Sequence, residues 1–253
     1  MRSNHAKVLH TLAGRSLVQH VVHTASTLQP ARLAVVVGHQ AAEVMAHLGD
    51  GPVWVQQADQ LGTGHAVRLA MQALPPAPSG DEGVTLILYG DVPLVSQQTL
   101  SAAIDAARSG CVGLVTAEFD NPAELGRIIR NGAGRIQRIV EYRDASPQER
   151  DICEINSGIM ALPSARLRTW LQRIEPHNAQ GEYYLTDIIE FAVADSVPVE
   201  GVVAATPEEV NGVNDRAQLS ELERVYQLQQ SRRLIAAGVT IAEQQRIDIS
   251  VEV

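Results

Sequence analysis

Hydrophobic and polar positions divide this chain into two kinds of segment. Short unbroken apolar runs indicate strands covered on both faces, and longer segments with apolar residues three or four positions apart indicate amphipathic helices. The pattern predicts strands at 33–37, 53–55, 84–89, 111–118, 155–162 and 198–205, and helices at 15–28, 41–48, 66–74, 97–108, 164–174, 183–194 and from about 214 to 237. Strands and helices that alternate through short connections predict an α/β fold with a mostly parallel, doubly wound sheet.

Three stretches depart from this alternation. Residues 127–130 and 135–142 flank the turn sequence Asn131-Gly-Ala-Gly134, which predicts an antiparallel hairpin inserted into the sheet. Residues 1–14 show no strand pattern, and residues 75–83 form a linker rich in proline and glycine. Gly238 should end the long C-terminal helix as its C′ residue, and an extended segment should follow it.

Composition limits the function. With 253 residues, of which 45% are hydrophobic, the chain can bury a full core as a soluble globular protein. A formal net charge of −9 disfavours nonspecific binding to nucleic acid or to an anionic membrane. No apolar run is long enough for a transmembrane helix, and no signal peptide is recognisable. Cys111 and Cys153 have no metal-site spacing, so we expect buried free thiols and a cytoplasmic protein.

The run 84–89 ends in Gly90, Asp91 and Pro93, so a strand should deliver one carboxylate at its carboxyl end. Open α/β sheets bind ligands at that edge. A carboxylate there suits Mg²⁺, which takes few protein ligands and completes its shell with water and phosphate oxygens. The alternative is an aspartate that only caps the next helix, and the run alone does not separate the two interpretations.

Other candidate residues each have a structural alternative. The sequence Leu61-Gly-Thr-Gly64 at a strand-to-helix junction can cradle a phosphate or form a plain turn. Gln57 and Gln60 can read a base through their amides or be solvated. Lys7 is the only lysine, and it can contact a phosphate or simply be exposed.

Three polar residues farther along the chain are equally open to two interpretations. Glu141 and Asn156 are polar residues that interrupt apolar strands. Their side chains can form hydrogen bonds with sugar hydroxyls, or they can lie at strand edges with their hydrogen bonds already satisfied. Asn214 precedes the long helix, where an N-cap is the simpler role. Hydrolase triads and paired-histidine metal sites have no counterpart among the eight histidines.

Several motifs taken together identify a family resemblance. The chain contains KVLHTLAG at 7–14, QLGTGHA at 60–66, LYGDVPL at 88–94, GRI at 126–128, IVEYRDA at 139–145, EINSGI at 154–159, NAQGEYYLTD at 178–187 and GVND at 212–215. In this order they resemble the uridyltransferase domain of bacterial bifunctional N-acetylglucosamine-1-phosphate uridyltransferase/glucosamine-1-phosphate acetyltransferases. The resemblance implies a Rossmann-like sugar nucleotidyltransferase fold. It also implies the condensation of UTP with N-acetylglucosamine 1-phosphate for peptidoglycan and lipopolysaccharide synthesis.

The resemblance also implies a role for individual residues. Lys7 and Asp91 match catalytic positions, and Asp91 with Asn214 matches the Mg²⁺ ligands. The implied nucleotide-binding residues are Gln57, Gly62, Thr63, Tyr89, Gly90 and Asp91, and the implied sugar-binding residues are Gly126, Glu141, Asn156, Tyr184 and Thr186. These roles fit an in-line transfer that proceeds by positioning and charge neutralisation.

The family pattern begins with a strand and a glycine-rich loop that would precede residue 1. We therefore expect residues 1–237 to form a nucleotidyltransferase domain without its first central strand, and residues 238–253 to begin a truncated β-helix region. Such a chain is expected to be a monomer, poorly folded and inactive. Two alternatives are another sugar-1-phosphate nucleotidyltransferase and a noncatalytic nucleotide-sugar-binding module.

Overall fold

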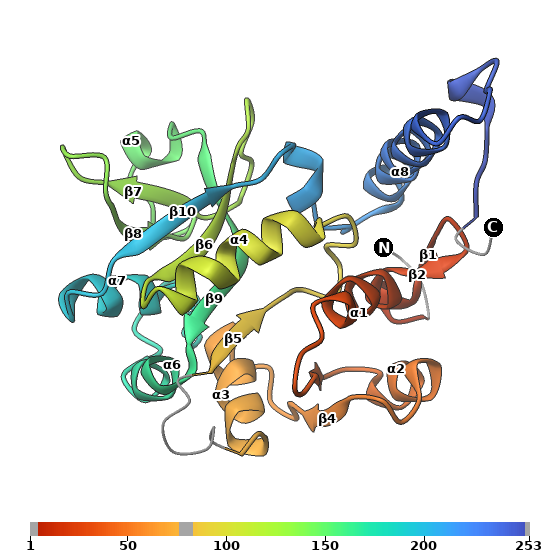
Figure 1. Cartoon of the computed structure of the whole chain (residues 1–253). Coiled ribbons are helices and arrows are strands. Elements are labelled where there is room, and N and C mark those ends of the chain that lie inside the picture. Colours follow the sequence, from red (N-terminus) through yellow and green to blue (C-terminus); the bar gives the residue numbers. More distant parts are fainter. Residues whose placement is uncertain (1–4, 76–82, 251–253) are drawn as a thin grey trace.

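The protein was examined as a computed structural model, which describes residues 5–75 and 83–250. The predicted linker at 75–83 lies almost wholly outside the described residues. The described residues form an α/β fold, as the sequence predicts (Figure 1).

The main sheet has six strands and is mixed. Its order is β10 (Val199–Val203), β6 (Val112–Glu118), β9 (Glu154–Pro163), β7 (Arg127–Arg130) and β8 (Ile136–Val140), and β5 (Val84–Ile87) also pairs with β9. β10 runs parallel to β6, whereas β9 is antiparallel to β5, β6 and β7. The prediction of a mostly parallel sheet is therefore wrong in this respect. The predicted hairpin β7–β8 is confirmed, and β9 follows it in the reverse direction between β5 and β6.

A second, two-stranded sheet lies apart from the main one. Its strands β3 (Ala34–Val37) and β4 (Val53–Gln56) are parallel and are connected by α2 (Ala41–Leu48). Among the described residues, no ladder joins β3 to β5, and β5 pairs with β9 alone. Three of the four residues of β5 are only half-buried. The prediction that this strand is covered on both faces is therefore only partly met.

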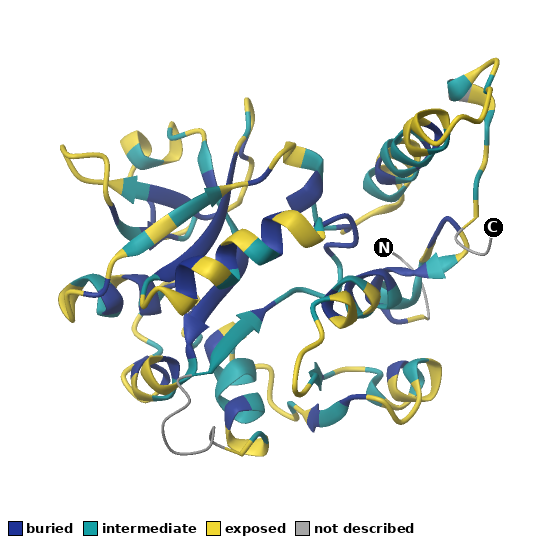
Figure 2. Ribbon diagram, in the orientation of Figure 1, coloured by how far each residue is buried: buried dark blue, intermediate teal, exposed yellow. Residues whose placement is uncertain are grey.

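Two hydrophobic clusters cover opposite faces of the main sheet. On one face α4 (Gln97–Arg108) packs against Val115 and Ala161. A Cβ at Gly113 would come within 2.2 Å of the Ala103 carbonyl oxygen, so only glycine allows this helix to approach so closely. On the other face α3 (Thr63–Ala73), α6 (Ser164–Leu171) and α7 (Asp187–Ala194) pack against Leu114 and Met160. Figure 2 shows the buried positions concentrated in β6 and β9.

The N-terminal part packs against the long last helix. The 3-10 turn η1 (Lys7–Leu9) leads into a small hairpin, β1 (Thr11–Leu12) and β2 (Arg15–Ser16), in a stretch where no strand is predicted. The hairpin escapes prediction because it depends on left-handed backbone at Ala13 and Gly14 rather than on an apolar pattern. Its buried residues and those of α1 (Leu17–Thr27) meet Leu222 of α8 (Arg216–Ala236).

Several local predictions are confirmed and others need correction. Gly238 ends α8 with φ of +94°, as predicted for a C′ glycine. The segment after α8 contains η3 (Gln244–Arg246), and the remaining short elements are α5 (Pro147–Arg150) and η2 (Pro207–Val210). Cys111 is half-buried and Cys153 is exposed, so the prediction of buried thiols is wrong, although both are free. Both lie in connections next to strands rather than within them. In the described ranges no helix is long and apolar enough to cross a membrane.

Candidate active site

Three side chains from distant parts of the sequence meet at one point. The Lys7 ammonium donates to Asp91 Oδ2 at 2.5 Å and to Asn214 Oδ1 at 2.9 Å. Asp91 follows β5, Lys7 begins η1, and Asn214 precedes α8. The backbone fixes this meeting as well, because the Val213 N–H donates to the Asp91 carbonyl at 3.0 Å. The structure therefore brings together the predicted catalytic lysine and both predicted metal ligands.

The structural alternative for Asn214 is wrong. The N-cap of α8 is the next residue, Asp215, whose carboxylate accepts from the Gln218 N–H at 2.8 Å. Because Asp215 performs the capping, the Asn214 side chain can face Lys7 instead.

The oxygens of Asp91 and Asn214 fit a magnesium ion. They converge on one positively charged atom, the Lys7 ammonium nitrogen, and carboxylate and amide oxygens are ligands of the hard type that Mg²⁺ prefers. No cluster of three or more His, Cys, Asp or Glu side chains suited to a metal ion occurs within the described residues. A Mg²⁺ held by one carboxylate and one amide needs no such cluster, since water and substrate phosphates supply its other ligands.

The turn after β5 connects this point to the rest of the site. Val8 lies against Gly90, where an added Cβ would be 3.5 Å from Val8 Cγ1. Tyr89 packs against the backbone of Gly158 in β9, where an added Cβ would be 2.5 Å from the Tyr89 ring. Burial raises the pKa of the Tyr89 phenol to about 12, so this side chain is a neutral hydrogen-bonding group at physiological pH.

The loop before α3 is joined by hydrogen bonds to residues far along the chain. Gln57 Nε2 donates to the Gly62 carbonyl at 3.1 Å. The Tyr183 N–H donates to the Leu61 carbonyl and the Gly64 N–H donates to the Tyr183 carbonyl, each at 2.8 Å. Gly62 has φ of +100°, and a Cβ there would be 2.8 Å from the Tyr183 carbonyl oxygen. A side chain at this position would therefore separate the two segments.

The other residues of this loop take different positions. Thr63 Oγ1 accepts from the Leu185 N–H at 3.3 Å. Gln60 is exposed, and its side chain lies next to Gly38.

Four of the five predicted sugar-binding residues form one cluster. Thr186 donates to Glu141 Oε1 at 3.1 Å. Gly126 lies beside Glu141 and Asn156, since an added Cβ would be 3.3 Å from Glu141 Oε2 and 3.6 Å from Asn156 Cβ. The Asn156 side chain accepts from the Gly158 N–H at 2.9 Å. Because the Tyr89 ring packs against Gly158, this hydrogen bond connects the cluster to Tyr89.

Tyr184, the fifth of these residues, is buried, and its hydroxyl accepts from Gln180 Nε2 at 2.9 Å. Tyr184 lies two residues before Thr186, which places it beside the cluster and near Glu141. Burial also raises the pKa of Glu141 and raises that of nearby Asp187 to about 6, with the repulsion of neighbouring carboxylates adding to the shift at both.

Sequence reasoning missed two residues that shape the site. Gly158 supports the Tyr89 ring, and it has φ of +81° inside a strand. Arg127 is buried, and its guanidinium donates to the carbonyls of Ala123, Leu125 and Arg150. A glycine inside a strand is a recognised sign of close approach and offered a signal for Gly158. For Arg127 no local pattern distinguishes a buried arginine from an exposed one.

Comparison with known proteins identifies relatives of this chain. Residues 1–240 match the family of MobA-like NTP transferase domains. The chain is 50% identical to the bifunctional protein GlmU of Burkholderia lata, covering 98% of this chain and 54% of the relative. It is 47% identical to the bifunctional protein GlmU of Alkalilimnicola ehrlichii, covering 98% and 53%. The chain thus spans about half the length of the curated relatives that it matches.

A solved structure shares the fold. UDP-glucose pyrophosphorylase, crystallised with UDP-glucose, superposes with a TM-score of 0.66 at 15% identity, covering 87% of this chain and 89% of that one. The nucleotidyltransferase fold predicted from the motifs is thereby confirmed.

Proposed function

The chain belongs to the MobA-like NTP transferase domain family, and we propose that it transfers UMP from UTP to N-acetylglucosamine 1-phosphate. The products are UDP-N-acetylglucosamine and pyrophosphate, a precursor step for cell-envelope polymers. Mg²⁺ is the cofactor, held by Asp91 and Asn214, and the protein acts as a cytoplasmic monomer without nucleic-acid or membrane partners.

One observation carries this proposal. Residues proposed for the metal, the nucleotide and the sugar follow one another in the fold. Lys7 bonds Asp91, which lies two residues after Tyr89, and the Tyr89 ring lies against Gly158. The Gly158 N–H bonds the Asn156 side chain, and Gly126 lies beside both Asn156 and Glu141. A nucleotide and a sugar phosphate must lie end to end for an in-line transfer, and a continuous site of this kind supports that arrangement.

Each part of the site has a defined task. The Gln57 amide next to Gly62 suits the donor and acceptor pattern of a uracil ring. Thr63, Tyr89 and Gly90 border the ribose and phosphates. The cluster of Gly126, Glu141, Asn156 and Thr186, with Tyr184 behind it, suits the hydroxyl and acetamido groups of the sugar.

The reaction itself needs no covalent intermediate. An oxygen of the sugar phosphate forms a bond to the α-phosphorus of UTP, and the bond from that phosphorus to the bridging oxygen of pyrophosphate breaks. Lys7 brings one positive charge to the phosphates, where negative charge accumulates in the transition state. Bound Mg²⁺ would add charge neutralisation at the phosphate oxygens.

The test measures pyrophosphate release from UTP and N-acetylglucosamine 1-phosphate. It is run on this chain and on a form with about 20 added N-terminal residues that supply a strand and a glycine-rich loop. We expect Mg²⁺-dependent release from the extended form and its loss in an extended Asp91→Asn variant, because the amide cannot anchor the metal by charge. Mg²⁺-dependent turnover that survives in folded Asp91→Asn protein would contradict the role of Asp91.

Two controls separate the alternatives. Better turnover of dTTP with glucose 1-phosphate would replace the proposed substrates by those of another sugar nucleotidyltransferase. Calorimetric binding of UDP-N-acetylglucosamine, with no pyrophosphate above a protein-free control in either form, would favour the noncatalytic binding module.

A further inference from the structure

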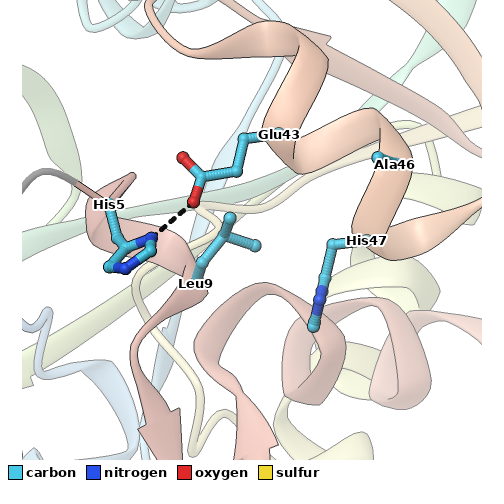
Figure 3. A pocket seen from close by; sticks show the side chains of 5 residues that line it. All are labelled: His5, Leu9, Glu43, Ala46 and His47. Carbon is cyan, nitrogen blue, oxygen red and sulfur yellow. Dashed lines mark hydrogen bonds and ion pairs between the residues drawn. The ribbon is translucent and has the colours of Figure 1, made fainter.

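The residues immediately before Lys7 are tied to helix α2 by one carboxylate. His5 Nδ1 lies 2.6 Å from Glu43 Oε1, and the Ala6 N–H donates to Glu43 Oε2 at 3.4 Å. In Figure 3 a dashed line joins His5 to Glu43, and both residues line a pocket together with Leu9, Ala46 and His47. The hydrogen bond with His5 lowers the pKa of Glu43, which keeps the side chain a charged acceptor near neutral pH. The two oxygens of Glu43 therefore hold two consecutive residues.

Packing reinforces this connection on the same helix. The Ala6 side chain is buried with Val37 and Val44, and Val44 is the neighbour of Glu43 in α2. Ala6 also starts the turn that contains Lys7, because its carbonyl accepts from the Leu9 N–H at 2.9 Å. The position of Ala6 consequently determines where η1 begins and how the Lys7 side chain reaches Asp91.

We propose that Glu43 is a positioning residue for Lys7. By fixing His5 and Ala6, it holds η1 where the lysine ammonium can reach Asp91 and Asn214. Glu43 contacts His5 and the Ala6 N–H, so it acts through the backbone that leads into the turn. The consequence for phosphate binding rests on the proposed function, whereas the effect on Lys7 itself does not.

The single lysine allows a direct measurement. An amine-acetylating reagent must reach the Lys7 side-chain nitrogen, so the contacts of that nitrogen with Asp91 and Asn214 slow its labelling. Remaining lysine is acetylated with a heavy-isotope reagent after denaturation, and trypsin then releases residues 3–15 with the modified lysine and without the chain's α-amine. The ratio of light to heavy label gives the rate of reaction at Lys7 in the folded protein.

The variants are Glu43→Ala, Glu43→Gln, Asp91→Ala and His47→Ala. We expect Glu43→Ala to speed labelling by about two- to five-fold, the range for losing exposed charge-assisted contacts. Glu43→Gln keeps the shape and one acceptor oxygen, so its rate should lie between wild type and Glu43→Ala. Asp91→Ala gives the rate of a lysine released from its carboxylate. His47→Ala is the matched control, because it changes the same pocket through a side chain that contacts Ser16.

Wild-type labelling rates in both Glu43 variants, with faster labelling in Asp91→Ala, would overturn the proposal. Equal acceleration by His47→Ala would also overturn it, since the effect would then belong to the pocket in general. Thermal melts establish that each variant is folded, and Glu43→Gln carries the test if Glu43→Ala is not. Calorimetry with UTP is the second readout: faster labelling with unchanged UTP affinity keeps the positioning role but removes Lys7 from the phosphate site.

Discussion

Gly158→Ala tests how the backbone of β9 shapes the site through Tyr89. The substitution adds one methyl group at a position with φ of +81°, where the new Cβ would lie 2.5 Å from Tyr89 Cε2 and 2.9 Å from Cζ. These distances are shorter than any stable carbon contact, so the ring or the strand must move. Movement of the ring would disturb the boundary between the proposed nucleotide-binding and sugar-binding residues.

Two costs add at Gly158. An alanine forced into left-handed backbone costs about 1–2 kcal/mol. Inserting a methyl group into a packed region costs a further ~1–3 kcal/mol. In a domain of this size each kcal/mol lowers Tm by about 2–4 °C, so the overpacking alone should lower it by roughly 2–12 °C.

Gly110→Ala is the matched control. Gly110 has φ of +85°, but nothing lies within 4 Å of the Cβ that would be added there. It therefore has the backbone cost without the contact with Tyr89. The difference in Tm and in affinity between the two variants therefore isolates the effect of the contact between residue 158 and Tyr89.

The assay combines thermal melts with calorimetric titration of UDP-N-acetylglucosamine. We expect Gly158→Ala to melt below Gly110→Ala and to bind the nucleotide sugar more weakly, while Gly110→Ala binds like wild type. Equal melting temperatures together with unchanged affinity in Gly158→Ala would refute the idea that this glycine supports Tyr89.

Two other changes give clear expectations. Because burial raises the pKa of Asp187 to about 6 from 3.8, its contribution to stability is complete below pH 3.8 and is lost as pH rises through 6. Asp187→Asn should therefore raise Tm at neutral pH and lose this advantage in acid. Thermal melts of both proteins from acid to neutral pH measure the effect. A difference in Tm between variant and wild type that stays constant over this range would contradict the raised pKa of Asp187. A strand added before residue 1 should pair with the edges of β3 and β5 that have no partner among the described residues, and it should raise Tm. Equal melting temperatures with and without the added strand would show that these edges do not take up a further strand.

Local rules in the sequence determined much of this protein. The bounds of α2 and α4 agree with prediction because apolar spacing along a helix reflects backbone geometry alone. The hairpin β7–β8 follows from its turn residues, and Gly238 ends α8 because few other residues tolerate its backbone angle. The motifs were also sufficient to identify the family, because their residues match the family motifs and occur in the same order along the chain.

Only the tertiary structure decided which segments meet. The direction of β9 depends on ladder partners up to 79 residues away, such as Thr85 with Leu162 in their register, and no local pattern encodes that choice. Asn214 faces Lys7 only because Asp215 caps α8, whereas the sequence alone made capping the simpler role for Asn214. The same holds for Glu43 and Gly158, whose contacts lie with residues distant along the chain. Side-chain chemistry can be read residue by residue, but proximity arises from the packing of the whole chain.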